Sequence, residues 1–126
     1  MRLLTAQKKK YEMLGLNEIY LDYAGSFSPA HPIHGYLADI GAGQCVSFCQ
    51  NNSKLEIHDR SGKCLGRLSN EGGEKLFELL DHILEVRVVA MLRRNRDDSD
   101  EKFQNLIKAD EWELPVLEVV YSSSRK

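Results

Sequence analysis

The stretch from Lys54 to Leu92 constrains the fold most, because its pattern of apolar residues changes twice within a short distance. Leu55 and Ile57 alternate with Glu56 and His58, which is the period of a strand with one buried side and one solvated side. A Ser-Gly turn, a returning strand, an amphipathic helix and a third strand follow almost without linkers. The pattern predicts a compact β-β-α-β unit.

The turn and the second strand of this unit have their own signals. Gly62 tolerates the positive φ that the tight turn at Asp59–Lys63 requires. Strict alternation in the strand Cys64–Leu68 places Cys64, Gly66 and Leu68 on one side, and Lys63, Leu65 and Arg67 on the other. We therefore expect a hairpin with Cys64 and Arg67 on opposite faces.

A helix and the clearest strand complete the unit. Apolar residues recur at helical spacing from Leu76 to Ile83, with Phe77 among them, and Ser69 or Asn70 can cap the start of this helix. Leu84–Leu92 then alternates strictly between apolar and polar residues. We expect the helix to cover the sheet and Leu84–Leu92 to lie within it.

The C-terminal part predicts one more helix and a last strand. The strand is expected over Trp112–Tyr121, with Pro115 confining its start to an edge or a bulge and Trp112 anchoring the core. Ser99 is expected to cap a short inserted helix whose apolar stripe is Phe103, Leu106 and Ile107.

The N-terminal part is more irregular. Residues 1–16 are polar enough for a helical arm or an unstructured chain end. Alternation predicts a first strand at Ile19–Tyr23 and a second at Gln44–Gln50. Between them, glycines and prolines predict a long irregular loop over Gly25–Gly43, and loops of such length are often functional.

These elements predict a mainly β (α+β) fold. A small, partly open antiparallel β-barrel of the oligonucleotide-binding type, with one covering helix and a short inserted helix, fits best. The strands lie too close in sequence for βαβ crossovers. Because 126 residues can bury one continuous core, we expect a single domain at 17–122, after the arm at 1–16 and before a disordered tail at 123–126.

Composition narrows the class of protein. No apolar run is long enough to span a bilayer, and the opening residues do not resemble a secretory signal. Three cysteines, an odd number, favour reduced thiols over a disulfide framework. We therefore expect a cytoplasmic protein, associated with the nucleoid if the source is bacterial.

We expect neither catalysis nor a cofactor. The chain has no glycine-rich phosphate loop followed by lysine, no nucleophile elbow and no HExxH motif. His31 and His34 precede Cys45 and Cys49 as if to bind zinc, but four residues along a strand separate the two cysteines by roughly 13 Å. We therefore expect no metal site there, and Cys64 is interpreted as a small core residue.

Charge is unevenly distributed, although the net charge of −2 gives no general reason to expect nucleic acid. The hairpin has more basic than acidic residues, and so has the end of the strand that follows the helix. An acidic stretch comes next, formed by Asp97, Asp98, Asp100, Glu101, Asp110, Glu111 and Glu113. The sequence predicts a dipolar molecule with a basic rim and an acidic flank.

Four segments in order resemble the HIRAN domain, a modified oligonucleotide-binding barrel attached to DNA helicases and translocases. They are GQCVSFCQ (Gly43–Gln50), KLEIHDRSGKCLGRLS (Lys54–Ser69), LEVRVVAML (Leu84–Leu92) and PVLEVVYS (Pro115–Ser122). The segment Val88–Tyr121 also resembles the extreme C-terminal region of some bacterial RecQ-type helicases. The resemblance implies a non-catalytic accessory domain of a RecQ-like helicase in DNA repair, with the ATP-dependent motor elsewhere in the same polypeptide.

The chain departs from that family at two segments. HIRAN domains that capture a 3′ DNA end share an aromatic-aromatic-basic-glycine segment and an N-x-Y-D segment before the hairpin. Here the corresponding segments are Leu21–Gly25, which lacks the basic residue, and Asn51–Lys54. The resemblance thus implies the barrel without the family's means of capturing a DNA end.

Binding of single strands requires a basic groove with exposed rings on which bases stack. The candidate residues are Arg60, Lys63, Arg67, Arg93, Arg94, Arg96, Tyr23 and Tyr36, with Phe48 as a further ring. They predict contact with single-stranded or frayed DNA, with the motor domains of the same polypeptide as a second partner and no membrane contact.

Two other interpretations remain open at this point. The basic residues can be a solvated strand face and the aromatic residues core, in which case the domain would be a structural or protein-interaction module that docks on the motor through its acidic flank. A small stand-alone hydrolase is more remote, because it would need a deep pocket with converging titratable groups. The sequence does not indicate an oligomeric state.

Overall fold

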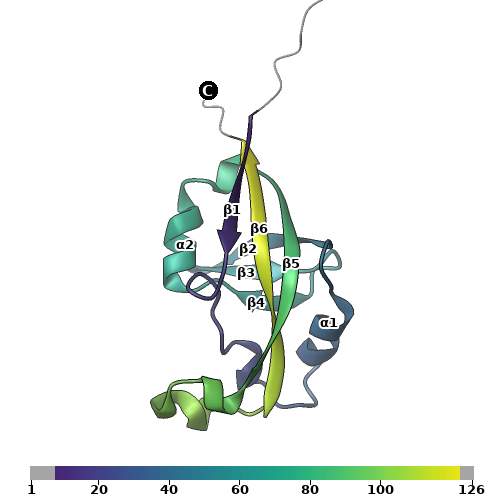
Figure 1. Ribbon diagram of the computed structural model, residues 1–126, viewed down its shortest axis with the longest axis vertical. Coiled ribbons are helices and arrows are strands. Elements are labelled where there is room, and N and C mark those ends of the chain that lie inside the picture. The colour runs from purple at the N-terminus through teal and green to yellow at the C-terminus, as the bar shows by residue number, and fades with distance from the viewer. Residues whose placement is uncertain (1–7, 123–126) are drawn as a thin grey trace, which may run out of the picture.

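The computed structural model describes residues 8–122, in which a curled sheet is flanked by short helices (Figure 1). Within this range, six strands form one antiparallel sheet in the order β1-β6-β5-β2-β3-β4. The strands are β1 (Lys9–Leu14), β2 (Cys45–Asn51), β3 (Lys54–His58), β4 (Cys64–Arg67), β5 (Ile83–Asn95) and β6 (Glu111–Ser122). The helices are α1 (Ile33–Asp39) and α2 (Asn70–Phe77), with 3-10 turns η1 (Ala24–Ser26), η2 (Leu80–His82), η3 (Arg96–Asp98) and η4 (Glu101–Leu106).

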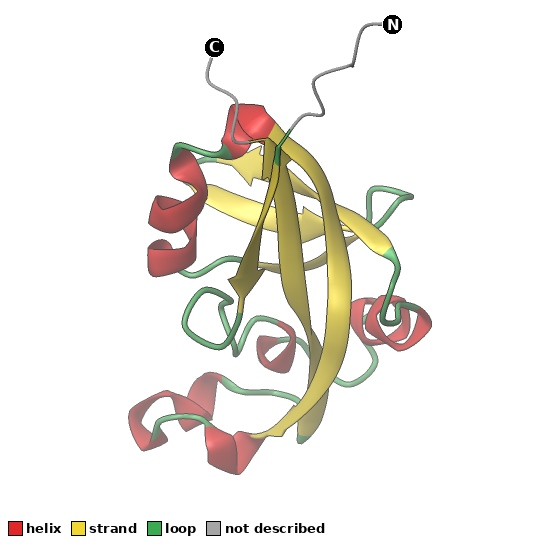
Figure 2. Ribbon diagram, turned by 45° about the horizontal axis from the view of Figure 1, so that its top comes forward, coloured by secondary structure: helices red, strands yellow, loops and turns green. Residues whose placement is uncertain are grey.

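The sheet curls into an open barrel. β5 and β6 run along the molecule, and β2, β3 and β4 lie across them, as Figure 2 shows from a second direction. β2 joins the two halves, since it pairs with β5 at Cys45 and Val46 and with β3 from Ser47 onward. The two edges of the sheet approach where Ile19, just after β1, bridges Leu68, just after β4. This confirms the predicted mainly β, partly open antiparallel fold.

The core lies inside this curl and draws on both halves of the sheet. Its most deeply buried side chains include Leu14, Leu37, Ile57, Leu65, Leu76, Leu117 and Val119. Trp112 is 3% exposed and its indole N–H donates to the carbonyl of Leu21 at 2.9 Å, which confirms it as a core anchor. No helix within residues 8–122 is long and apolar enough to cross a bilayer.

The predicted helical arm is wrong where the structure describes it. Lys9–Leu14 forms β1, which pairs with β6 from Ser122 back to Leu117. The three lysines before Tyr11 hide the alternation, and pairing with a neighbouring strand overrides local preference. Residues 1–7 of the arm and the predicted tail at 123–126 lie outside the described residues.

The predicted strand Ile19–Tyr23 is also wrong. Only its start extends the sheet, through the Ile19 bridge and a hydrogen bond from the Tyr20 N–H to the carbonyl of Arg67 at 2.9 Å. The chain then turns into η1, where Ser26 donates its hydroxyl to the carbonyl of Tyr23 at 2.7 Å. This turn brings the rings of Tyr20 and Tyr23 against Arg67 of β4.

The segment Gly25–Gly43 was predicted as an irregular loop but contains α1. Ile33 and Leu37, four residues apart, are buried on one side of this helix. Pro32 stands at its N-cap, where a missing N–H costs no helical hydrogen bond. The punctuation in this segment therefore marks the ends of a short helix.

The covering helix is confirmed but lies earlier than its apolar spacing predicts. α2 begins after Ser69, whose hydroxyl accepts from the N–H of Gly72 at 3.1 Å. Leu76 is fully buried, whereas Phe77, predicted as part of the apolar stripe, is 72% exposed. The helix ends there, and η2 carries the chain into β5.

The C-terminal predictions hold in outline. Among the described residues, β6 pairs with β1 only from Leu117 onward, so at Pro115 the only neighbouring strand is β5. Proline lacks a backbone N–H and is tolerated here because no strand on the other side requires a hydrogen bond from it. The inserted helix is the 3-10 turn η4, capped by Asp100 instead of Ser99. Ile107 is buried but Phe103 and Leu106 are exposed, so the predicted apolar stripe is wrong for those two.

Candidate nucleic-acid interface

The hairpin β3–β4 has a β-bulge that decides which side chains share a face. Ile57 pairs with Gly66 and His58 pairs with Cys64, so Leu65 is an extra residue on β4 and points into the core. The prediction that Cys64 and Arg67 lie on opposite faces is therefore wrong. Beyond the bulge, Cys64 rejoins the face that carries Arg67.

The turn of the hairpin is built as the sequence predicts. Gly62 has a φ of +85°, which glycine adopts without strain. The carboxylate of Asp59 accepts from the N–H groups of Ser61 and Lys63, at 2.8 and 2.9 Å. The turn is thereby held in shape, and Arg60 and Lys63 extend from it as exposed cations.

Two tyrosines from the segment before η1 stack with Arg67. The guanidinium carbon of Arg67 lies 4.5 Å from the ring centroid of Tyr20 and 5.9 Å from that of Tyr23. The rings of Tyr20 and Tyr23 meet edge to face, with centroids 6.4 Å apart. Tyr20 is 39% exposed, so this stack has an accessible aromatic side.

α1 supplies a second pairing of cation and ring. Tyr36, on this helix, lies beneath the ammonium group of Lys63 at 5.1 Å from its ring centroid. Tyr23, Tyr36 and Phe48 are all partly buried and pack against the core. These three rings are therefore only partly available for stacking with a base. Tyr20, which was not among the predicted residues, is more exposed than any of them.

The tyrosine and the cysteine at the centre of this face are uncharged near neutral pH. Burial first, and then a hydrogen bond with Cys64, raises the pKa of the Tyr23 hydroxyl. Burial likewise raises the pKa of the Cys64 thiol. The pKa of Glu56 is lowered, chiefly by its hydrogen bond with His58 and then by that from Asn51. Arg67 therefore stands beside an uncharged Tyr23 and the stabilised carboxylate of Glu56.

The other three predicted arginines do not extend this basic surface. Arg94 is bound to the carboxylate of Asp22 at 3.2 Å and to the carbonyl of Asp98 at 2.9 Å. Arg96 donates to the carbonyl of Ile107 at 2.6 Å and pairs with Asp110 at 3.4 Å. Both guanidinium groups therefore hold the η3–η4 insertion against the sheet.

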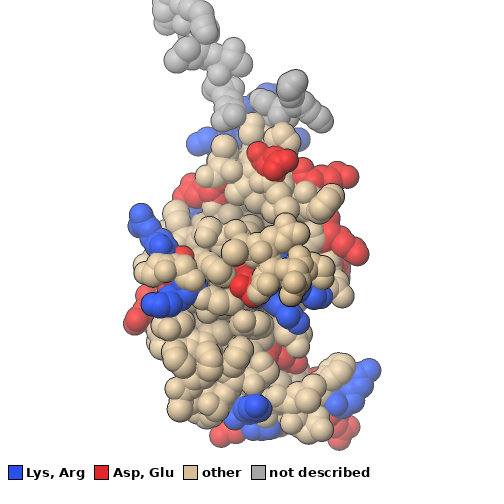
Figure 3. All heavy atoms as spheres, turned by 180° about the vertical axis from the view of Figure 1, so that it is seen from behind, with Lys and Arg blue, Asp and Glu red and all other residues tan. Residues whose placement is uncertain are grey.

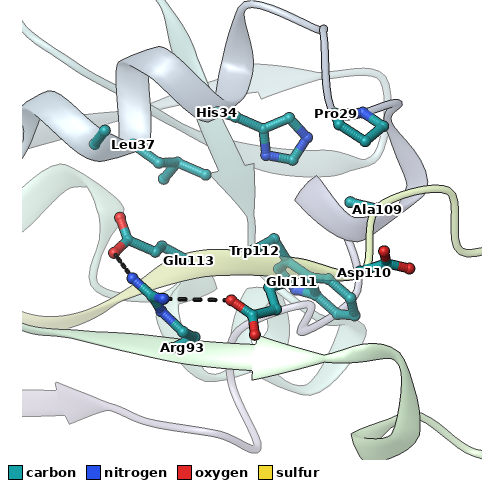
Figure 4. A pocket seen from close by; sticks show the side chains of 10 residues that line it. Pro29, His34, Leu37, Arg93, Ala109, Asp110, Glu111, Trp112 and Glu113 are labelled. Carbon is teal, nitrogen blue, oxygen red and sulfur yellow. Dashed lines mark hydrogen bonds and ion pairs between the residues drawn. The ribbon is translucent and has the colours of Figure 1, made fainter.

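Arg93 is occupied in the same way. Its guanidinium group lies 3.5 Å from the carboxylate of Glu113, the residue opposite it on β6, and 3.3 Å from that of Glu111, two residues earlier on the same strand (Figure 4). Basic and acidic segments that look like separate patches in sequence thus neutralise each other. The predicted dipolar arrangement is wrong here, and Figure 3 shows the cations of the rear face in separate groups among acidic ones.

A pocket lined by no residue of the hairpin lies on another part of the described structure. It measures about 630 Å³ and lies between α1 and the start of β6. Figure 4 shows His34 and Leu37 on one side of it, with Trp112 and the Arg93 ion pairs on the other. Arg93, Glu111 and Glu113 of its lining bind one another, and Asp110 pairs with Arg96.

Comparison of the chain with family models, curated proteins and solved structures gives no match. The case for a function therefore depends on the geometry of the hairpin face. Of the predicted residues, the fold brings together Lys63, Arg67, Tyr23 and Tyr36, with Arg60 at the adjoining turn. We call Tyr20, Tyr23, Tyr36, Lys63 and Arg67 the cation–aromatic surface.

Proposed function

We propose that this domain contacts single-stranded or frayed DNA through the cation–aromatic surface, as a non-catalytic accessory domain of a RecQ-like helicase. The observation that carries the proposal is the stacking of Arg67 on Tyr20 and Tyr23, beside the Lys63–Tyr36 pair. The three tyrosines come from segments distant in sequence from the hairpin that carries Lys63 and Arg67, and their rings lie against these two cations.

This arrangement suits a flexible, unpaired strand. A base can stack on the exposed part of Tyr20 while Lys63 and Arg67 contact phosphates on either side. Stacking on tyrosine orders the guanidinium of Arg67 before the strand arrives, which lowers the entropic cost of binding. Because such contacts read the backbone and the flat face of any base, we expect little sequence preference.

The proposal predicts a large loss of binding when the two stacked cations are reversed. We expect the Lys63→Glu/Arg67→Glu variant to bind a fluorescein-labelled oligothymidine at least about tenfold more weakly at low salt, because it loses two phosphate contacts and gains repulsion. Fluorescence anisotropy at two ionic strengths measures both the affinity and its dependence on salt. The unaltered domain should lose affinity as salt rises, and the variant should lose much less.

A control with the same change in net charge makes this test specific. Lys102 and Lys108 are exposed on and beside η4, away from the hairpin, so Lys102→Glu/Lys108→Glu should bind as the unaltered domain does. Equal losses in the two double variants would show only a general effect of charge. No loss in the hairpin variant would reject the cation–aromatic surface as the binding site.

One observation favours the alternative, a protein-interaction module without DNA affinity. Phe77 and Leu84 are 72% and 45% exposed, and they line two neighbouring hollows of about 350 and 290 Å³ that share Leu80. Apolar surface of this kind is typical of docking sites. In that case the unaltered domain would show no salt-sensitive binding to oligonucleotides in the same titration.

A further inference from the structure

Three side chains on the hairpin face converge in a way that the sequence analysis did not predict. Each of Glu56, His58 and Cys64 offers one ligand atom, and these atoms all lie within 4.8 Å of one another. All three side chains are partly buried. Within residues 8–122 no other group of three such residues comes as close.

The backbone explains this convergence. Glu56 and His58 are two residues apart on β3, so they share a face. The bulge at Leu65 then pairs Cys64 with His58 across the ladder and places its thiol on that same face. Without the extra residue, Cys64 would point away from the other two.

We propose that Glu56, His58 and Cys64 bind a divalent transition-metal ion of the zinc class. Thiolate, imidazole and carboxylate are together the ligand types that zinc takes in proteins. With metal–ligand bonds of about 2.0 to 2.3 Å, ligand atoms of a tetrahedral site are about 3.3 to 3.8 Å apart. Nε2 of His58 and Oε1 of Glu56, now 2.9 Å apart, would therefore separate slightly, and the sulfur of Cys64, within 4.8 Å of both ligand atoms, needs only a small shift. Three protein ligands leave the fourth position for water.

The present hydrogen bonds mark out the same geometry. Nε2 of His58 lies 2.9 Å from Oε1 of Glu56, and the ion would take the place of the proton they share. Asn51 donates to the other carboxylate oxygen, Oε2, at 2.9 Å and would keep Glu56 oriented. The Tyr23 hydroxyl lies 3.4 Å from the sulfur of Cys64 and can donate to the thiolate. Glu56 and Cys64 therefore already have outer partners of the kind that zinc ligands usually have.

The charges and the proton balance. Binding forms a metal–sulfur bond as the S–H bond of Cys64 breaks, and that proton leaves to solvent. The proton between Nε2 of His58 and Oε1 of Glu56 is displaced as well, and it moves to Nδ1 of the neutral ring or to solvent, while no electron is transferred. One thiolate and one carboxylate neutralise the two positive charges of the ion. No excess charge is therefore placed beside Arg67, and the site does not depend on the proposed contact with DNA.

One of the remaining cysteines gives a matched control. Cys45 donates to the carboxylate of Glu85 at 3.2 Å, and among the described residues it belongs to no group of three ligand side chains. It lies on β2 where that strand pairs with β5, outside the proposed site, whereas Cys49 stands opposite Glu56 in the β2–β3 ladder. A metal bound through any accessible thiol would respond to the loss of Cys45, and a metal bound at the hairpin face would not.

The test is a Co²⁺ titration of the reduced domain, followed by absorption spectroscopy and then by competition with Zn²⁺. We expect one equivalent to bind with the strong visible bands of a tetrahedral site and a near-ultraviolet band from thiolate to cobalt, and Zn²⁺ to displace it. Cys64→Ser should abolish the thiolate band, and His58→Gln should weaken binding at least about tenfold. Cys45→Ser should change neither.

Tyr23→Phe, which keeps the packing of the ring, should weaken binding about tenfold or more through loss of its hydrogen bond to sulfur. Circular dichroism confirms that each variant is folded. A thiolate band that survives in Cys64→Ser, that disappears in Cys45→Ser, or that never forms in the unaltered domain would overturn the proposal.

Discussion

Replacing Gly72 with alanine is expected to destabilise the domain more than the same replacement at any other glycine. A Cβ atom at this position would lie 2.1 Å from the carbonyl oxygen of Glu18 and 2.9 Å from its carbonyl carbon. Both are backbone atoms of the segment that joins the two edges of the sheet, and the neighbouring Ser69 N–H donates to the same carbonyl at 2.9 Å. The clash cannot be relieved by a side-chain rotation, so the helix and this segment must separate.

Overpacking of this kind costs about 3 kcal/mol, a large part of the stability of a small domain. The adjacent Gly73 is a close control, because a Cβ there meets nothing within 4 Å. Gly73→Ala should be neutral or stabilise α2 by up to about 1 kcal/mol, since alanine is the better helix former. Urea unfolding followed by circular dichroism measures both. Equal stabilities for the two variants would contradict the close approach of α2 to the segment after β1.

The second large effect is expected on binding. Tyr20→Ala should weaken the affinity for oligothymidine by about fivefold to a hundredfold, because stacking of one base on an aromatic ring contributes about 1 to 3 kcal/mol. The variant also removes the ring that holds the guanidinium of Arg67 at 4.5 Å. Its salt dependence should change little, because both cations of the surface remain.

Tyr11 provides the matched control for this experiment. It is 56% exposed on β1, at the edge of the sheet formed with β6, and has no ring or cation partner among the described contacts. Tyr11→Ala removes a similar aromatic area from a different face and should leave the affinity unchanged. If the two variants bind equally well, Tyr20 is not a stacking platform.

Local pattern predicted the hairpin, the covering helix and the two long strands β5 and β6, because each of them is encoded within a few residues. Alternation at Leu55 and Ile57 and the glycine of the turn need no information from the rest of the chain. β1 could not be found in this way, because its polar residues become a strand only when β6 lies beside them. α1 was hidden for the opposite reason, since Pro32 suggested a break at the position where a helix begins.

The candidate site was predicted in part for the same reason. Lys63 and Arg67 were found because both are on the hairpin, where charge can be counted along the chain. Tyr20 was missed because only the turn after the Ile19 bridge brings it to Arg67. The bulge at Leu65 breaks the alternation on which the placement of Cys64 depended, and nothing in the local sequence marks it.

The arginines of β5 were misjudged because net charge was counted along the chain and not across strands. Arg93 stands opposite Glu113 in the β5–β6 ladder, so residues of opposite sign that are far apart in sequence are neighbours in the sheet. A basic run therefore predicts a binding surface only when the residues opposite it are known.

The most direct test of the central claim is an NMR titration of the ¹⁵N-labelled domain with a short oligothymidine at low salt. We predict that the amide shifts concentrate at Tyr20–Tyr23, Tyr36 and Lys63–Arg67, and that they reverse when salt is added. The contradictory result would be shifts confined to Arg93–Asp98 or to α2, or no shifts at all at saturating oligonucleotide.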